Sequence, residues 1–106
     1  MRKAAVYRNG VLAGYLSETD KIFNFRYDEN YFTNRNYPAI SLTLPKSKPE
    51  YSSESMFPFF FNMLSEGVNR KLQSFQLKID ENDYFGLLLQ TAQFDTIGAI
   101  TIKPID

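Results

Sequence analysis

Carboxylates are the side chains of this sequence that are grouped closely enough to suggest chemistry. Asp28 and Glu29 are adjacent, and residues 80–83 read Asp-Glu-Asn-Asp. Oxygen ligands suit Ca²⁺ or Mg²⁺, but residues 80–83 lack the acidic spacing and the glycine of an EF-hand loop. Acidic residues at the start of a helix also cap its free N–H groups and complement its dipole. We interpret both groups as helix caps and predict no metal site. A small carboxylate-based enzyme remains a distant alternative.

The residue types that are missing exclude most other catalytic chemistry. The 106 residues include no histidine and no cysteine. A Ser-His-Asp triad, a Cys-His pair, a zinc site with nitrogen or sulfur ligands and a Cys-ligated iron–sulfur cluster are therefore ruled out. The five glycines form neither a GxGxxG motif nor a phosphate-binding loop. We predict no catalytic residues and no cofactor.

Aromatic side chains could instead stack on nucleic-acid bases. Phe23, Phe25 and Tyr27 alternate with Asn24 and Arg26, a pattern typical of the buried face of a strand or of a base-stacking platform. Nucleic-acid surfaces need an excess of positive charge, whereas 12 Lys and Arg here balance 12 Asp and Glu. We therefore interpret the stripe as core and predict no direct contact with nucleic acid.

Residues 57–70 are the best candidates for contact with a partner protein. The segment begins Phe-Pro-Phe-Phe-Phe, so a helix there is apolar nearly all round. A small domain has little interior in which to bury such a helix. Either the helix is central or a partner covers part of it. The partner-binding residues predicted on this basis are Phe57, Phe61, Glu66, Gly67, Val68, Asn69 and Arg70.

Val68 has two interpretations. It lies beside an expected turn at 65–67, where it could enter a pocket of a partner. It also begins a stripe with Leu72, Phe75 and Ile79, at the spacing of one helix face. The periodicity favours the second interpretation, in which the stripe is buried in the domain.

The elements that must position these residues begin with a meander of three antiparallel strands. Asn9-Gly10 is the pair that best fits a type I′ hairpin turn, and it separates strands at 5–7 and 11–16. A third strand is expected at 22–27. Gly14 indicates a bulge or a close backbone approach. Alternation places three residues of the second strand on one face: Leu12, Gly14 and Leu16.

The rest of the chain is expected to add helices and one strand. Asp28 caps a short helix, residues 39–44 are extended, and residues 46–55 form a polar loop. Three helices are expected in the second half. The first is capped by Ser53 or Ser55 with Pro58 in its first turn, the second follows the stripe that begins at Val68, and the third follows Asp80. A strand at 97–102 is expected to rejoin the sheet.

These elements predict one α+β domain over residues 1–106. An antiparallel sheet, made of the N-terminal meander and the C-terminal strand, packs against two or three helices. The sequence has no run of 18 apolar residues, and its N-terminus turns polar too soon for a signal peptide. We expect a cytoplasmic protein.

Several stretches, in the right order, make this sequence similar to the N-terminal subdomain of the HipA toxin kinase family. Residues 57–67, FPFFFNMLSEG, are the most specific and resemble the family's LFPFFxNLLPEG. Ser65 stands where family members usually have proline, and Val68 where they often have an aromatic residue. The other matches are residues 6–16 (the opening hairpin), 25–28 (the third strand), 40–45 (the SLSLP segment), 83–88 and 97–100.

The resemblance implies a HipS-like protein, in which this subdomain stands alone in a three-component toxin–antitoxin system. The chain ends where the body of the kinase would begin. The implied partners are a HipA-like serine/threonine kinase toxin that lacks this subdomain and a helix-turn-helix DNA-binding protein in the same complex, with no membrane contact. The implied role is an antitoxin that binds and neutralises the kinase. The alternative is a structural subunit that stabilises or activates it.

Overall fold

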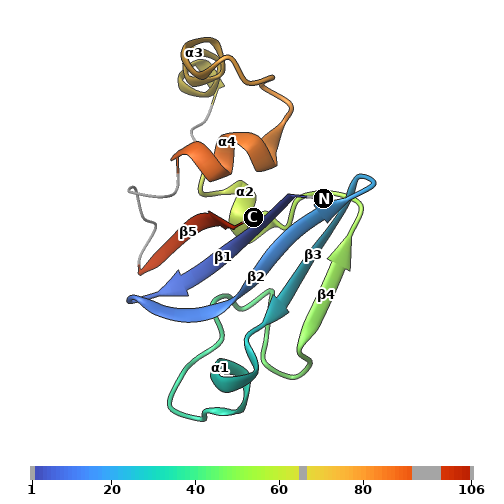
Figure 1. Cartoon of the computed structure of the whole chain (residues 1–106), viewed down its shortest axis with the longest axis vertical. Coiled ribbons are helices and arrows are strands. Elements are labelled where there is room, and N and C mark those ends of the chain that lie inside the picture. Colours follow the sequence, from blue (N-terminus) through green and yellow to red (C-terminus); the bar gives the residue numbers. More distant parts are fainter. Residues whose placement is uncertain (1, 65–66, 92–98, 106) are drawn as a thin grey trace.

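The computed structural model describes residues 2–64, 67–91 and 99–105 (Figure 1). In this part of the chain it has a five-stranded antiparallel sheet and four helices, which confirms the predicted α+β class. The strands lie in the order β4-β3-β2-β1-β5. The elements are β1 (Arg2–Arg8), β2 (Val11–Thr19), β3 (Ile22–Tyr27), α1 (Glu29–Thr33), β4 (Glu50–Ser53), α2 (Pro58–Phe61), α3 (Gly67–Leu77), α4 (Tyr84–Thr91) and β5 (Ile100–Ile105).

The predicted meander is confirmed. Asn9 and Gly10 have φ angles of 51° and 78°, and positive φ at both positions is what a type I′ turn requires. β5 rejoins the sheet beside β1, as expected, and it begins at Ile100. The expected strand residues 97 and 98 lie outside the described part of the chain.

A bulge in β2 overturns the alternation expected there. Val6 pairs with Gly14, but Tyr7 pairs with Leu12, so Ala13 is an extra residue on the second strand. Because a bulge shifts the pleat by one residue, Ala13 turns into the core and is fully buried. Leu12, expected on the same face as Gly14, is only half-buried.

Gly14 also lies at a close backbone approach. A Cβ atom at this position would lie 2.4 Å from the carbonyl oxygen of Arg26 and 2.8 Å from Cζ of Phe25. Only glycine fits such a space. At the neighbouring bulge the N–H of Asp28 donates to the Ala13 carbonyl at 2.8 Å. The bulge therefore fixes where the chain leaves the sheet for α1.

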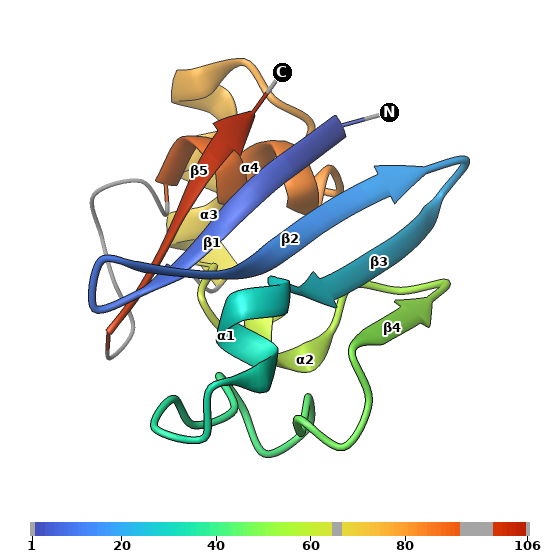
Figure 2. The same ribbon diagram turned by 60° about the horizontal axis from the view of Figure 1, so that its bottom comes forward.

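The core lies on one face of the sheet. Phe23, Phe25 and Tyr27 of β3 all point into it, so the aromatic stripe is core, as predicted. Phe60 of α2 and Phe85 of α4 are fully buried against the same face. Figure 2 shows α2, α3 and α4 behind the sheet, with the near face uncovered except for α1 at its lower edge.

A capping side chain begins α1, and a proline begins α2. Asp28 caps α1, as predicted, and its carboxylate accepts from the N–H groups of Asn30 and Tyr31. Pro58 opens α2, as predicted, but the capping position is Phe57 rather than a serine, and no side chain bonds there. Proline removes one of the free N–H groups of the first turn, and the N–H groups of Phe60 and Phe61 donate to the Phe57 carbonyl at 3.0 and 2.9 Å.

The third helix of the second half begins later than predicted. Its cap is Asp83, whose Oδ1 accepts from the Gly86 N–H at 3.1 Å. Asp80 instead caps the preceding turn, where its Oδ1 accepts from the Asn82 N–H at 2.8 Å. Asp80 and Asp83 are both able to cap a helix. The helix begins after Asp83, and its residues Phe85, Leu87 and Leu88 are fully buried against the sheet.

Residues 39–44 form a turn rather than the extended stretch expected from their alternation. The Tyr27 hydroxyl accepts from the Ile40 N–H at 3.1 Å and donates to the Leu44 carbonyl, so both sides of the turn are tied to one buried group. The N–H of Leu44 closes the turn on the Ser41 carbonyl at 3.1 Å. Leu42 is consequently 99% exposed.

The predicted polar loop at 46–55 contains a strand. Residues 50–53 form β4, which pairs with β3 at the edge of the sheet. Tyr51 packs against the core, while Asn24 of β3 donates to Glu50 and Ser52 on the other face. One inward side chain in a polar stretch was too weak a signal for a strand.

Candidate protein-binding site

The predicted contact segment begins inside the core. Phe57 is 7% exposed and packs edge-on against Phe60, with ring centroids 6.3 Å apart. Phe60 in turn packs on Phe25 of the sheet. Little of the Phe57 side chain is available to another molecule, so its first role is to anchor α2.

Phe61 and Arg70 lie together at the junction of three helices. The Phe61 ring meets the Tyr84 ring edge to face, with centroids 5.1 Å apart and an angle of 89°. The Arg70 guanidinium carbon lies 5.5 Å from the Phe61 centroid and 5.6 Å from that of Tyr84. This cation–π arrangement joins α2, α3 and α4. Nε of Arg70 is buried and has no hydrogen-bond partner among the described residues.

The remaining predicted residues are near the start of α3. Asn69 is exposed. Gly67 and Val68 form the first positions of α3, but the structure does not describe the Val68 side chain, and Glu66 lies outside the described residues.

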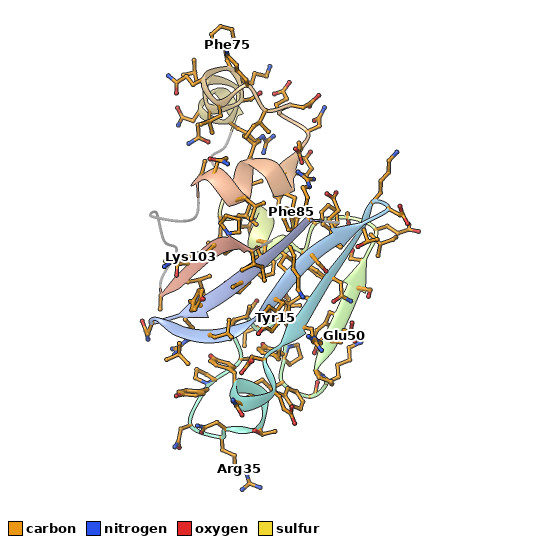
Figure 3. The ribbon with its side chains drawn as sticks, viewed as in Figure 1. Tyr15, Arg35, Glu50, Phe75, Phe85 and Lys103 are labelled. Carbon is orange, nitrogen blue, oxygen red and sulfur yellow. The ribbon has the colours of Figure 1, made fainter. Side chains whose placement is uncertain are left out.

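α3 turns its apolar stripe away from the rest of the domain. Leu72 is 54% exposed and Phe75 is 85% exposed, and Figure 3 shows Phe75 at the far end of the molecule from the sheet. The half-buried residues of α3 are polar instead: Arg70, Gln73 and Ser74. The prediction that the stripe is buried in this domain is therefore wrong for Leu72 and Phe75. We call these two residues the α3 stripe.

Sequence reasoning placed the α3 stripe correctly on one helix face but assigned it to the core. The helix begins three residues after Leu64, a buried residue, and is joined to α4 by a turn in which Lys78 has a φ of 58°. α3 stands above α4 in Figure 1, and the half-buried residues of α3 are polar. Periodicity identifies an apolar face but not the molecule that covers it.

Asp83, from the acidic group at 80–83, forms an ion pair that links two elements of the fold. Arg2 of β1 donates to both carboxylate oxygens of Asp83, at 3.0 and 2.8 Å, and also pairs with Glu18 of β2. The Arg2 guanidinium holds the pKa of Asp83 below its ordinary value, and the Gly86 N–H acts in the same direction. Among the described residues there is no cluster of three or more acidic side chains that could hold a metal ion.

The helices provide no way across a membrane. Among the described residues, no helix is both long and apolar enough to span a bilayer.

Comparisons with known proteins agree with this architecture. A family model described as the HipA N-terminal domain matches residues 4–103. An uncharacterized protein of Haemophilus influenzae is 29% identical over 103 residues, which are 97% of this chain and 92% of that protein. A solved structure titled "N-terminal domain of HipA toxin" is similar with a TM-score of 0.74 and 25% identity, over 100% of this chain and 94% of the solved chain.

Proposed function

Since the chain belongs to the HipA N-terminal domain family, we propose that it is an antitoxin subunit. It binds a HipA-like serine/threonine kinase toxin that lacks this domain and neutralises it. The family suggests a toxin–antitoxin context and association with HipA-like proteins, and a HipA N-terminal domain is a non-catalytic subdomain.

The α3 stripe is the observation that carries the proposal. Two large apolar side chains, Leu72 and Phe75, are largely exposed on one face of a helix. Burying a leucine or phenylalanine side chain fully is worth roughly 1.5–3 kcal/mol. A partner that covers both residues would therefore gain much of the free energy that a specific complex needs.

The polar surroundings of the α3 stripe support the same surface. Asn69 is exposed on the same helix, and Arg70 and Phe61 lie half-buried at its junction with α2 and α4. An apolar centre with a polar and aromatic border is the usual composition of a protein interface. The proposed kinase-binding surface is the α3 stripe with Asn69. Phe61 and Arg70, which lie on the inward side of α3, and Glu66, Gly67 and Val68 remain predicted contacts.

Binding can neutralise the kinase by blocking access to its active site or by holding an inactive conformation. The second candidate is a structural subunit that stabilises or activates the kinase, and it uses the same surface. Co-expression in a bacterial growth assay separates the two roles, with a HipA-like kinase that lacks this domain as the toxin. Recovery of growth supports the antitoxin, worse growth supports the activator, and unchanged toxicity contradicts both.

A matched pair of variants tests the surface in the same assay. Leu72→Asp places a charge in the α3 stripe, and we expect it to abolish the recovery of growth. Leu42→Asp makes the same change at an exposed leucine outside the helices, in the turn after α1, and should preserve it. Equal behaviour of the two variants would contradict the assignment of α3. Immunoblotting for both chains establishes that the variants accumulate like the wild type.

A further inference from the structure

The face of the sheet opposite the core carries an ordered set of side chains. The strand register places Lys103 of β5, Ala5 of β1, Tyr15 of β2, Arg26 of β3 and Glu50 of β4 in one row across all five strands. With about 4.8 Å between strands, the row is roughly 19 Å long. Figure 3 shows Lys103, Tyr15 and Glu50 in this line, in front of the sheet.

Aromatic rings and cations alternate on this face. Nζ of Lys3 lies 5.2 Å from the Tyr15 centroid, and the guanidinium carbon of Arg26 lies 5.7 Å from it. Nζ of Lys103 lies 5.6 Å from the Tyr7 centroid. These distances are in the range of cation–π contacts, which hold the charged ends close to the sheet. We call Lys3, Arg26, Lys103 and the two tyrosines the sheet-face cluster.

The cations of the sheet-face cluster have no anionic partner in the part of the chain that the structure describes. Among the described residues, the structure records no ion pair for Lys3, Arg26 or Lys103, even though Arg26 lies opposite Glu50 in the register. Glu50, the carboxylate in the row, accepts from the Asn24 side chain at 2.9 Å. The chain has no net charge, so this concentration of positive charge on one uncovered face is local.

The geometry points to a docking surface for an acidic segment of a partner protein on this face. Carboxylates of the segment pair with Lys3, Lys103 and Arg26, and an apolar or aromatic side chain between them lies on Tyr15. Charge complementarity of this kind fixes the partner's orientation and speeds association. The surface is separate from α3, which lies behind the sheet in Figure 2, so the protein can hold this partner and the proposed kinase at the same time.

An acidic protein segment fits better than a nucleic acid. A single strand of nucleic acid needs a continuous positive groove and several exposed rings for successive bases. Here the row ends at Glu50, and Asp28 and Glu29 stand where the chain leaves the sheet. These carboxylates would repel phosphates along one side of the face, whereas a segment with two or three carboxylates can be confined to β1, β2, β5 and Arg26 of β3.

NMR titration of the ¹⁵N-labelled full chain tests the proposal. The probe is a ten-residue peptide of alternating glutamate and valine, and the comparison probes are the same peptide with lysine for glutamate and a ten-nucleotide single-stranded thymidine oligomer. We expect saturable shifts of amides in β1, β2, β3 and β5 with the glutamate peptide only, weakened by added salt. Stronger binding of the oligomer, equal binding of the lysine peptide, shifts confined to other elements, or no saturable shifts would overturn the proposal.

Charge variants are expected to change the affinity for the glutamate peptide in opposite directions. Lys3→Glu with Lys103→Glu should weaken binding of the glutamate peptide by about tenfold or more. Lys21→Glu with Arg35→Glu changes the net charge equally but lies in exposed connections, and it should leave binding within a factor of about two. Glu50→Gln removes a repulsive carboxylate at an exposed position and should strengthen binding. Equal weakening by both double variants, or no gain from Glu50→Gln, would contradict a sheet-face site.

Discussion

At the scale of single residues, Tyr27 carries an unusual share of the fold. Its ring stacks on Tyr31 with centroids 6.0 Å apart, and its hydroxyl holds both sides of the turn at 40–44. Burial raises the pKa of Tyr27 to about 12, because the charged phenolate would lie among apolar groups. A residue that looks like one more member of an aromatic stripe in the sequence is therefore the hydrogen-bonding centre of a long loop.

We expect Tyr27→Phe to lower the free energy of unfolding by about 1–3 kcal/mol, because it leaves the Ile40 N–H and the Leu44 carbonyl buried without their partner. Urea denaturation measures the change. Tyr51→Phe is the matched control, since the Tyr51 hydroxyl donates to the exposed Pro45 carbonyl and water can replace it. Equal losses for the two variants would show that the Tyr27 hydroxyl has no special role.

The raised pKa of Tyr27 also predicts a pH dependence. The folded state holds the phenolic proton more tightly than the unfolded state, whose tyrosine pKa is about 10. This contribution to stability is complete below pH 10 and is lost as the pH rises through 12. Thermal unfolding between pH 9 and pH 12 should show a steeper loss for the wild type than for Tyr27→Phe, and parallel curves would refute the assignment.

Asp83 predicts the opposite dependence, at low pH. Its pKa is lowered by the Arg2 guanidinium, so its contribution is present above the unfolded value of about 4 and is lost as the pH falls below it. Asp83→Asn keeps a side-chain oxygen for the cap of α4 but loses the ion pair. The variant should be less stable at pH 7 and should lose less stability on acidification.

Urea denaturation at pH 7 and pH 3 measures both effects of Asp83→Asn. Asp80→Asn removes the same charge three residues earlier, where the structure records no ion pair among the described residues, and serves as the control. If both variants respond alike to acid, the link between β1 and α4 contributes nothing measurable.

At the scale of elements, the orientation of α3 is the feature with functional consequences. A helix whose apolar face is exposed contributes little to the stability of its own domain, and its exposed side chains can be buried by a partner. α4 is the opposite case, because Phe85, Leu87 and Leu88 are fully buried against the sheet. The two helices therefore have different roles, set by which of their faces turns inward.

This difference gives a matched prediction for the free chain. Phe75→Ala should change the free energy of unfolding by less than about 0.5 kcal/mol, since the ring is 85% exposed. Phe85→Ala should cost about 3–5 kcal/mol, because it empties a space in the core. Chemical denaturation of both variants measures the contrast. A large loss for Phe75→Ala would mean that α3 packs its stripe inward in solution.

Strands β1, β2, β3 and β5 and the hairpin turn could be predicted from the sequence because their signals are local. A type I′ turn requires positive φ at two positions, which Asn9 and Gly10 readily adopt. In β3, Phe23, Phe25 and Tyr27 alternate with polar residues. The outcome for Leu12, Leu42 and the α3 stripe depends on distant contacts instead: a bulge opposite Val6, the reach of the Tyr27 hydroxyl, and the path of the chain between α2 and α4. Local patterns do not contain that information.

The candidate site could be predicted only in part. Its surplus of apolar residues singles out the segment 57–70. Asn69 is exposed on the same helix as the α3 stripe, whereas Phe61 and Arg70 lie at the junction of that helix with α2 and α4. Leu72 and Phe75 were missed as contacts because a helical stripe at regular spacing is typical of a core. The exposed fraction of each side chain, which only the fold determines, distinguishes the two roles.

At the scale of the whole molecule, two surfaces lie on different sides of one sheet. The α3 stripe stands behind it and is apolar, whereas the sheet-face cluster in front is cationic and aromatic (Figures 2 and 3). The rigid sheet between them keeps the surfaces at a fixed relation. A protein built in this way can join two other chains.

The central claim is that the α3 stripe binds a HipA-like kinase, and calorimetric titration of that kinase with the purified chain tests it most directly. The wild type should bind saturably, and Phe75→Ala should raise the Kd by roughly 10- to 100-fold, because one largely exposed phenylalanine would no longer be buried in the complex. No binding of the wild type, or the same Kd for Phe75→Ala, would contradict the account.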